Sequence, residues 1–195
     1  MNYNPETGLI LSRVFDETFR ISGIDWSELG EFSTTHNYSR NANLKLVNEV
    51  EKHLYYIVSG SAGCFSFRNG KECCVQLCYE NQFFGDYVSM ITRTPSIIET
   101  RTLEKTVLIK IPFEKLLKFY NTLDPIVSEK IGRMSAEYLL MLKEEQLLDL
   151  QLLTAEERYK KLVYRNPAVL QRTPLKYIAS YLGITPESFS RIRRA

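Results

Sequence analysis

The 195-residue chain has only two histidines, His36 and His53, and no His-x-His pair. A metal enzyme built on a small β-barrel needs histidines and carboxylates clustered on its strands, so the sequence argues against one. The Gly-Ser-Ala-Gly segment at 60–63 is a turn rather than a phosphate-binding loop, and no nucleophile stands beside a general base. We therefore expect no enzyme activity, no bound metal and no cofactor.

Cysteines and long apolar runs are also scarce. The four cysteines include no Cys-x-x-Cys pair and fall among residues with a strand-like alternation: Cys64, Cys73, Cys74 and Cys78. Buried thiols are the expected state, with an iron–sulfur or zinc site as the alternative. The densest apolar stretch, residues 138–142, is far too short to cross a membrane. Because residues 1–8 carry no basic-then-apolar signal, we expect a cytoplasmic protein without a membrane partner.

The net charge of +2 hides an uneven distribution. Residues 155–195 hold nine lysines and arginines against three glutamates, whereas residues 1–154 hold sixteen basic and twenty acidic residues. A protein that binds a phosphate backbone gains affinity by displacing counterions with its basic side chains. The acidic body and the basic C-terminal segment therefore favour a nucleic-acid partner.

Residues 173–195 have the pattern of two short helices joined by a tight turn. Gly183 suits the end of the first helix, Thr185 suits the cap of the second, and Pro186 fits its first position. The apolar residues fall on facing sides of the two helices: Ile178, Ala179, Leu182, Phe189 and Ile192. This pattern predicts a helix-turn-helix with arginines on its outer side. The alternative is an ordinary helix pair with a solvated basic end.

The segment LKYIASYLGITPESFSRIRR resembles the DNA-binding end of Crp/Fnr-type bacterial transcription regulators, especially their shorter branch with little β-wing. The resemblance implies double-stranded DNA as the partner, with Arg191 contacting guanine and Glu187 accepting from cytosine. A bidentate arginine is worth roughly 1–3 kcal/mol of discrimination. The remaining candidates are Ser188 and Ser190 for bases or phosphate, and Thr185, Arg193, Arg194 and Lys176 for phosphates. For Arg193 and Arg194 a solvated tail is the alternative.

Residues 33–111 have the pattern of many short strands, preceded by a short amphipathic helix near 14–19 and a helical turn within 24–32. Ser59-Gly60 and Asn69-Gly70 are turn signals, and residues 101–111 predict a hairpin that turns near 103–105. LYYIVSG, FFGDY and LIKIP resemble parts of the cyclic-nucleotide-binding β-roll of the Crp/Fnr family. The predicted fold class is α+β: an antiparallel β-roll, a long helix and a C-terminal helix-turn-helix.

The family resemblance also locates a tentative effector pocket. In cyclic-nucleotide-binding relatives a Gly-Glu pair holds the ribose, and a following arginine neutralises the cyclic phosphate. By resemblance Gly85 and Asp86 match the pair, while the arginine and the next residue fall on Ser96 and Ile97. A buried phosphate without a guanidinium would be costly, so cyclic AMP is not expected. The pocket either binds another small molecule or is only structural.

Residues 122–153 predict a long helix that opens at Asp124-Pro125. Seven of its eight heptad positions are apolar, Glu145 being the exception: Val127, Ile131, Met134, Tyr138, Met141, Leu148 and Leu152. A second apolar face indicates that the helix packs on its own domain and on a second copy at once. Such a homodimer would place two recognition helices on a two-fold-related DNA site. The resemblance agrees on dimerisation, and RNA polymerase is a further candidate partner.

Thr154 and Glu157 have the spacing of a capping box, and we place a domain boundary there. The expected division is an effector-type β-roll with flanking helices at 1–121, the dimerisation helix at 122–153 and the helix-turn-helix domain at 154–195. We expect a dimeric, sequence-specific DNA-binding regulator. The alternative is a ligand-sensing or protein-interaction module whose helical tail does not read DNA.

Overall fold

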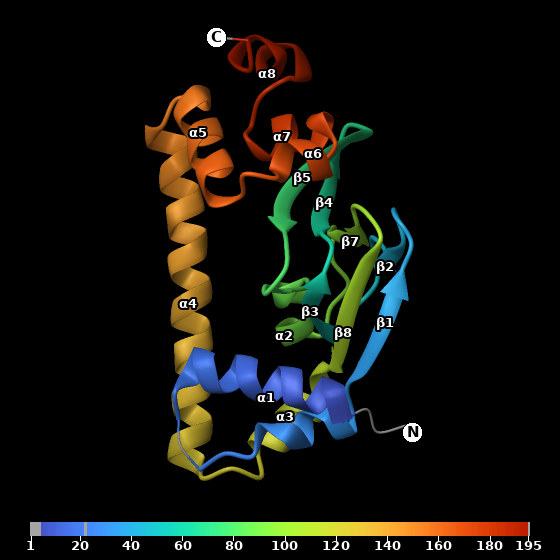
Figure 1. Ribbon diagram of the computed structural model, residues 1–195, viewed down its shortest axis with the longest axis vertical. Coiled ribbons are helices and arrows are strands. Elements are labelled where there is room, and N and C mark those ends of the chain that lie inside the picture. The colour runs from blue at the N-terminus through green and yellow to red at the C-terminus, as the bar shows by residue number, and fades with distance from the viewer. Residues whose placement is uncertain (1–4, 22, 195) are drawn as a thin grey trace.

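The computed structural model describes residues 5–21 and 23–194. Its centre is a roll of two four-stranded antiparallel sheets, ordered β1-β8-β3-β6 and β2-β7-β4-β5 (Figure 1). This confirms the predicted roll. The strands are β1 Thr34–Tyr38, β2 Asn43–Lys45, β3 His53–Ser59, β4 Ala62–Arg68, β5 Lys71–Cys78, β6 Phe83–Phe84, β7 Glu99–Thr102 and β8 Thr106–Pro112. β4 and β5 form a long hairpin across Asn69-Gly70, where both residues have positive φ.

The hairpin predicted at residues 101–111 is wrong. β7 pairs with β2 and β4, whereas β8 pairs with β1 and β3, so the two strands lie in different sheets. Leu103 between them is buried, and its N–H donates to the carbonyl of Ser61 at 2.8 Å. The connection crosses from one layer of the roll to the other. Its path is set by contacts with the distant turn at residues 60–61, which no local pattern reveals.

Helices close one end of the roll (Figure 1). They are α1 (Pro5–Phe19), the 3-10 helix η1 (Trp26–Glu31) and α3 (Phe113–Tyr120). Trp26 is fully buried among Phe15, Phe19 and Phe119, with ring centroids 4.9 to 5.9 Å from its own. These aromatic contacts make a dense core that fixes the helical base. A further short helix, α2 (Tyr87–Thr92), belongs to the roll.

The rod-like helix α4 (Pro125–Leu152) runs beside the roll from this base to the C-terminal helices (Figure 1). The Asp124 carboxylate caps it by accepting from the N–H of Ile126 at 2.9 Å. The seam predicted for dimerisation divides in two. Its first part packs on the helical base: Val127, Ile131 and Met134. Its second part is exposed: Tyr138, Met141, Leu148 and Leu152.

Four helices follow the rod: α5 (Ala155–Arg165), α6 (Val169–Arg172), α7 (Leu175–Tyr181) and α8 (Pro186–Ile192). The capping box at the start of α5 is present, with Thr154 accepting from the N–H of Glu157 and the Glu157 side chain accepting from the N–H of Thr154. Within the part of the chain described, no helix is both long enough and apolar enough to cross a membrane.

Candidate DNA-binding surface and effector pocket

The turn between α7 and α8 forms through the local signals in the sequence. Gly183 has a φ of +71°, and its N–H donates to the carbonyl of Ser180 at 3.0 Å. A left-handed residue of this kind ends a helix at little cost when it is glycine. The Thr185 hydroxyl then accepts from the N–H of Ser188 at 3.2 Å, and Pro186 occupies the first position of α8. The two helices are therefore separately terminated and capped.

Phe189 anchors α8 to the helices beneath it. Its side chain is 1% exposed, and its ring meets that of Tyr159 edge-on at 5.4 Å. The outer side of α8 is open to solvent, and α8 lies at the end of the molecule farthest from the helical base (Figure 1). Ser188 is half-buried, and the other predicted residues of this segment are exposed: Thr185, Glu187, Ser190, Arg191, Arg193 and Arg194. This surface presents three guanidiniums from one short segment.

Two of the predicted contact residues, Arg191 and Glu187, already make local contacts within α8 and its cap. Nη2 of Arg191 donates to the Ser188 hydroxyl at 3.2 Å, a contact that an incoming base edge can replace at small cost. The backbone N–H of Glu187 and the Thr185 hydroxyl hold the pKa of the Glu187 carboxyl below its usual value. Glu187 is thus an ionised acceptor at neutral pH, as a contact with cytosine N4 requires.

Lys176 occupies a different surface from the residues of α8. It lies on α7 with its ammonium 4.5 Å from the centroid of the Tyr177 ring and 3.5 Å from the carboxylate of Glu72 on β5. The ammonium remains largely exposed. A phosphate contact by Lys176 would therefore compete with a carboxylate of the roll.

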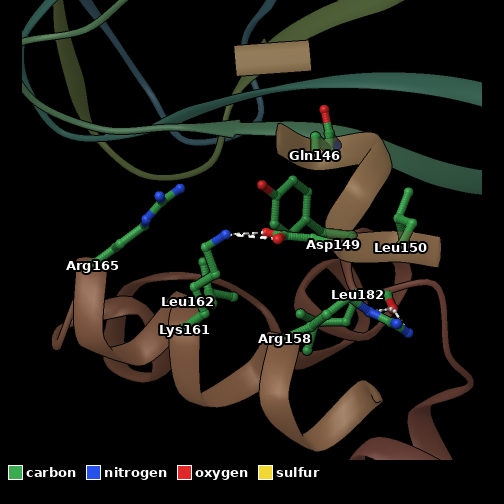
Figure 2. A pocket seen from close by; sticks show the side chains of 9 residues that line it. Gln146, Asp149, Leu150, Arg158, Lys161, Leu162, Arg165 and Leu182 are labelled. Carbon is green, nitrogen blue, oxygen red and sulfur yellow. Dashed lines mark hydrogen bonds and ion pairs between the residues drawn. The ribbon is translucent and has the colours of Figure 1, made fainter. Parts of the chain in front are cut away.

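A small pocket lies where α4, α5 and α7 meet (Figure 2). Lys161 contacts Glu145 at 2.8 Å and Asp149 at 2.7 Å, and Arg165 also pairs with Glu145. Hydrogen bonds from Arg165 and Lys161 lower the pKa of Glu145 to about 2. Arg158 donates to the carbonyl of Leu182 at 2.9 Å. The charged groups in this pocket already have partners within the chain. We therefore interpret the pocket as part of the contact between α4 and α5, not as a ligand site.

Two of the residues predicted for the effector pocket, Asp86 and Ser96, contact a lysine that sequence reasoning missed. Nζ of Lys45, on β2, donates to Oδ2 of Asp86 at 2.8 Å, to the Ser96 hydroxyl at 2.7 Å and to the carbonyl of Ile98 at 2.6 Å. The Lys45 and Asp86 side chains are 2% and 5% exposed. Ser96 also donates to Asp86. A lone lysine in a short polar strand carries no sequence signal for such a role.

Asp86 is ionised in this network and also caps a helix. Burial alone would raise the pKa of its carboxyl, but hydrogen bonds from Lys45 and Ser96 outweigh burial and lower it. Its other oxygen accepts from the N–H of Ser89 and caps α2. Gly85 has a φ of +152°, and a Cβ there would stand 3.2 Å from the carbonyl of His53. The side chain of Ile97, by contrast, is largely exposed.

The cysteines occupy different places: Cys64 and Cys78 lie in the core of the roll, and Cys74 lies in a cluster that also includes residues of the C-terminal helices. Cys64, Cys74 and Cys78 are buried, and Cys73 is half-buried. Burial raises the pKa of Cys74 and of Cys78 to about 12, so both thiols stay protonated at neutral pH. Among the residues described, no three histidine, cysteine or acidic side chains are grouped so that they could hold a metal ion.

Comparison with known proteins agrees with this architecture. Residues 35–122 match the family model for the cyclic nucleotide-binding domain. FixK2 from Bradyrhizobium japonicum is 19% identical with a TM-score of 0.68, and the alignment covers 83% of each chain. DNR from Pseudomonas aeruginosa, a transcriptional regulator, is 19% identical with a TM-score of 0.57, over 100% of this chain and 88% of that one.

The catabolite activator protein of Thermus thermophilus is 20% identical with a TM-score of 0.52, over 84% of this chain and 78% of that one. No curated protein sequence matches the chain. At these identities the structural likeness establishes the fold, and the resemblance inferred from the sequence is confirmed at that level. The chain thus has the Crp/Fnr-type fold, and its residues 35–122 are similar to the cyclic nucleotide-binding domain.

Proposed function

We propose that the protein is a dimeric, sequence-specific DNA-binding transcription regulator. The observation that carries the proposal is the group of exposed arginines at one end of the molecule: Arg191 on the capped helix α8, and Arg193 and Arg194 directly after its last residue. Guanidiniums on a short exposed helix can contact both the base edges and the flanking phosphates of a major groove. The fold shared with DNR, a transcriptional regulator, supports the same function. Such a regulator works in the compartment that holds the DNA.

The proposed contacts divide into reading and positioning. Arg191 reads guanine and Glu187 accepts from cytosine, while the hydroxyls of Ser188 and Ser190 reach bases or phosphate. Phosphate contacts set the register of the protein on the duplex without specifying sequence. We assign these to Thr185, Arg193, Arg194 and Lys176.

The exposed part of α4 supports a homodimer. Tyr138, Met141, Leu148 and Leu152 form the later part of the heptad seam, and Leu152 is 74% exposed. Large apolar side chains repeated along one helix are costly to leave in water, and a second α4 would cover them. Glu145, the polar seam position, pairs with Lys161 and Arg165 of its own chain, so it brings no unpaired charge into that interface. Light scattering after size exclusion should give twice the monomer mass.

The Lys45–Asp86 pair supports a regulator that does not bind cyclic AMP. By resemblance, Asp86 occupies the position that holds the ribose in relatives. Its carboxylate oxygens already accept hydrogen bonds from Lys45, from Ser96 and from the N–H of Ser89 at the start of α2. A cyclic nucleotide would have to break this buried pair without finding an arginine for its phosphate. A thermal-shift titration with cyclic AMP should therefore leave the melting temperature unchanged, and a strong stabilisation would exclude this assignment.

The test of DNA reading begins by selecting the preferred duplex from a randomised library. Wild-type protein should bind that duplex with a steep salt dependence, because phosphate contacts release counterions. Arg191→Ala should weaken binding to the selected duplex by about ten- to a hundredfold and leave mixed-sequence DNA nearly unaffected. Arg13→Ala, an exposed arginine of α1 far from α8, is the matched control. Failure to select any sequence, with no salt slope, would favour the module that does not read DNA.

A further inference from the structure

The helix-turn-helix and the roll share one hydrophobic core. From the roll come Phe65, Cys74, Leu77, Tyr79 and Leu103; from the helices come Val169, Tyr177, Ile178, Ala179, Leu182 and Phe189. Between residues 154 and 194 the described chain has four helices and no strand, and α7 packs directly on β5. A unit of about 40 residues rarely buries enough surface to be stable alone. The β4–β5 hairpin thus supplies the sheet against which these helices fold.

Arg172, at the end of α6, holds the helices to one edge of the roll. Its guanidinium contacts Glu80 at 2.6 Å and Glu104 at 2.7 Å. Each carboxylate is itself fixed by the turn between β3 and β4: Glu80 accepts from the N–H of Gly60 at 2.7 Å, and Glu104 accepts from the Ser61 hydroxyl at 2.8 Å. A planar guanidinium bonds to two fixed carboxylates in a restricted geometry. These contacts therefore fix the orientation of α6 relative to the roll as well as attracting the two parts.

Arg101, on β7, holds the middle of α7 from the roll side. Its guanidinium lies 4.0 Å from the centroid of the Phe65 ring, and Nη2 donates to the Tyr177 hydroxyl at 2.9 Å. Glu99 and Glu72 balance its charge. The Phe65 and Tyr177 rings meet edge-on at 4.9 Å. This cluster is largely buried, so its polar contacts are costly to break.

Two further hydrogen bonds tie the ends of the same segment. The Tyr79 and Thr173 hydroxyls lie 2.8 Å apart in a buried contact just before α7. Near the end of α7, the Ser180 hydroxyl accepts from the N–H of Cys74 at 2.8 Å. The segment is thus attached to the roll at its start, middle and end, and α8 follows α7 through their shared core.

We infer that Arg172 and Arg101 are positioning residues for DNA reading: through them the roll, rather than the helical unit itself, sets the angle of the recognition helix. The inference rests on the proposed DNA-binding function. In a dimer joined through α4, the separation of the two recognition helices then depends on these contacts. Loss of a contact should alter the preferred spacing of the two half-sites, not only the affinity.

The experiment compares Arg172→Met with wild type, because methionine keeps part of the aliphatic stem but makes no ion pair. Hydrogen exchange in residues 173–192 should speed up by about tenfold or more, the scale of losing charged hydrogen bonds. Exchange in α1 and β3 should stay at the wild-type rate. On duplexes whose selected half-sites are moved by one or two base pairs, the wild type should show one sharp optimum and the variant a broadened or shifted one.

Glu80→Gln combined with Glu104→Gln should reproduce the effect from the roll side. Arg93→Met removes an exposed ion pair with Glu114 of α3 and is the control. Unchanged exchange and an unchanged spacing optimum in Arg172→Met would overturn the inference, as would faster exchange spread evenly over the roll, which would mean general destabilisation. If wild-type protein binds no DNA, the proposed function fails, while local exchange in residues 173–192 still decides whether Arg172 positions the helices.

Discussion

Lys45→Met should destabilise the protein more than any surface change in the roll. The variant keeps an unbranched side chain but removes an ammonium that is 2% exposed and donates three hydrogen bonds. Asp86 would remain buried without its cation. Removing one partner of a buried ion pair costs about 3–5 kcal/mol. In a chain of this size that corresponds to a fall in melting temperature of about 6–20 °C.

The pH dependence of this loss has a definite sign. In wild type the pKa of Asp86 is lowered, so the pair stabilises the fold above the usual carboxyl pKa and loses its effect as the pH falls through the lowered value. In the variant the hydrogen bond and the charge of Lys45 no longer lower the pKa of Asp86, so that pKa should be higher than in wild type. The stability gap should therefore be largest at neutral pH and shrink in acid, where Asp86 is protonated in both proteins.

Urea unfolding followed by circular dichroism, at several pH values, measures this gap. Lys52→Met, an exposed lysine nearby in the chain, is the control and should change the unfolding free energy by less than about 0.5 kcal/mol. A loss below about 1 kcal/mol for Lys45→Met, or a gap that widens in acid, would refute the assignment of a buried, compensated pair.

Three other changes test separate parts of the molecule. Leu148→Glu places a charge on the exposed seam of α4 and should convert a dimer to a monomer in light scattering, with the helix content unchanged; a persistent dimer would remove the seam from the interface. Thr154→Ala deletes the capping box of α5 and should cost about 0.5–2 kcal/mol in urea unfolding, whereas no loss would mean that packing alone holds α5. In native protein a thiol reagent should modify Cys73 first, because burial keeps Cys74 and Cys78 protonated; equal rates at all sites would contradict the buried assignment.

Features set by neighbouring residues could be predicted from the sequence. Gly183, Thr185 and Pro186 act within one turn of helix, and the Thr154–Glu157 capping box closes over three residues. The Asn69-Gly70 hairpin is equally local. In each case the backbone conformation depends on a residue's own φ preference or on a hydrogen bond to a residue two or three positions away.

The crossing at residues 103–105 and the division of the α4 seam could not be predicted in this way. A hairpin and a sheet-to-sheet crossing share the same turn residues, and only the pairing of β7 and β8 with other strands separates them. The heptad pattern marks Ile131 and Leu152 alike as apolar, yet the first packs on the helical base and the second is exposed. Apolar periodicity predicts which face of a helix is buried, but it does not predict which part of the protein or of a partner packs against that face.

The sequence by itself determined the strand-rich character of residues 33–111, the long helix, the two capped helices of the helix-turn-helix and the basic character of its outer face, because these follow from local backbone preferences and from charge; it missed the short helix α2 within the roll. Only the tertiary structure decided that Lys45 neutralises Asp86, 41 positions away, and that Arg172 meets Glu80 and Glu104, 92 and 68 positions away. Contacts at such separations depend on how the sheets and helices pack, and a single sequence carries no periodic or compositional trace of them.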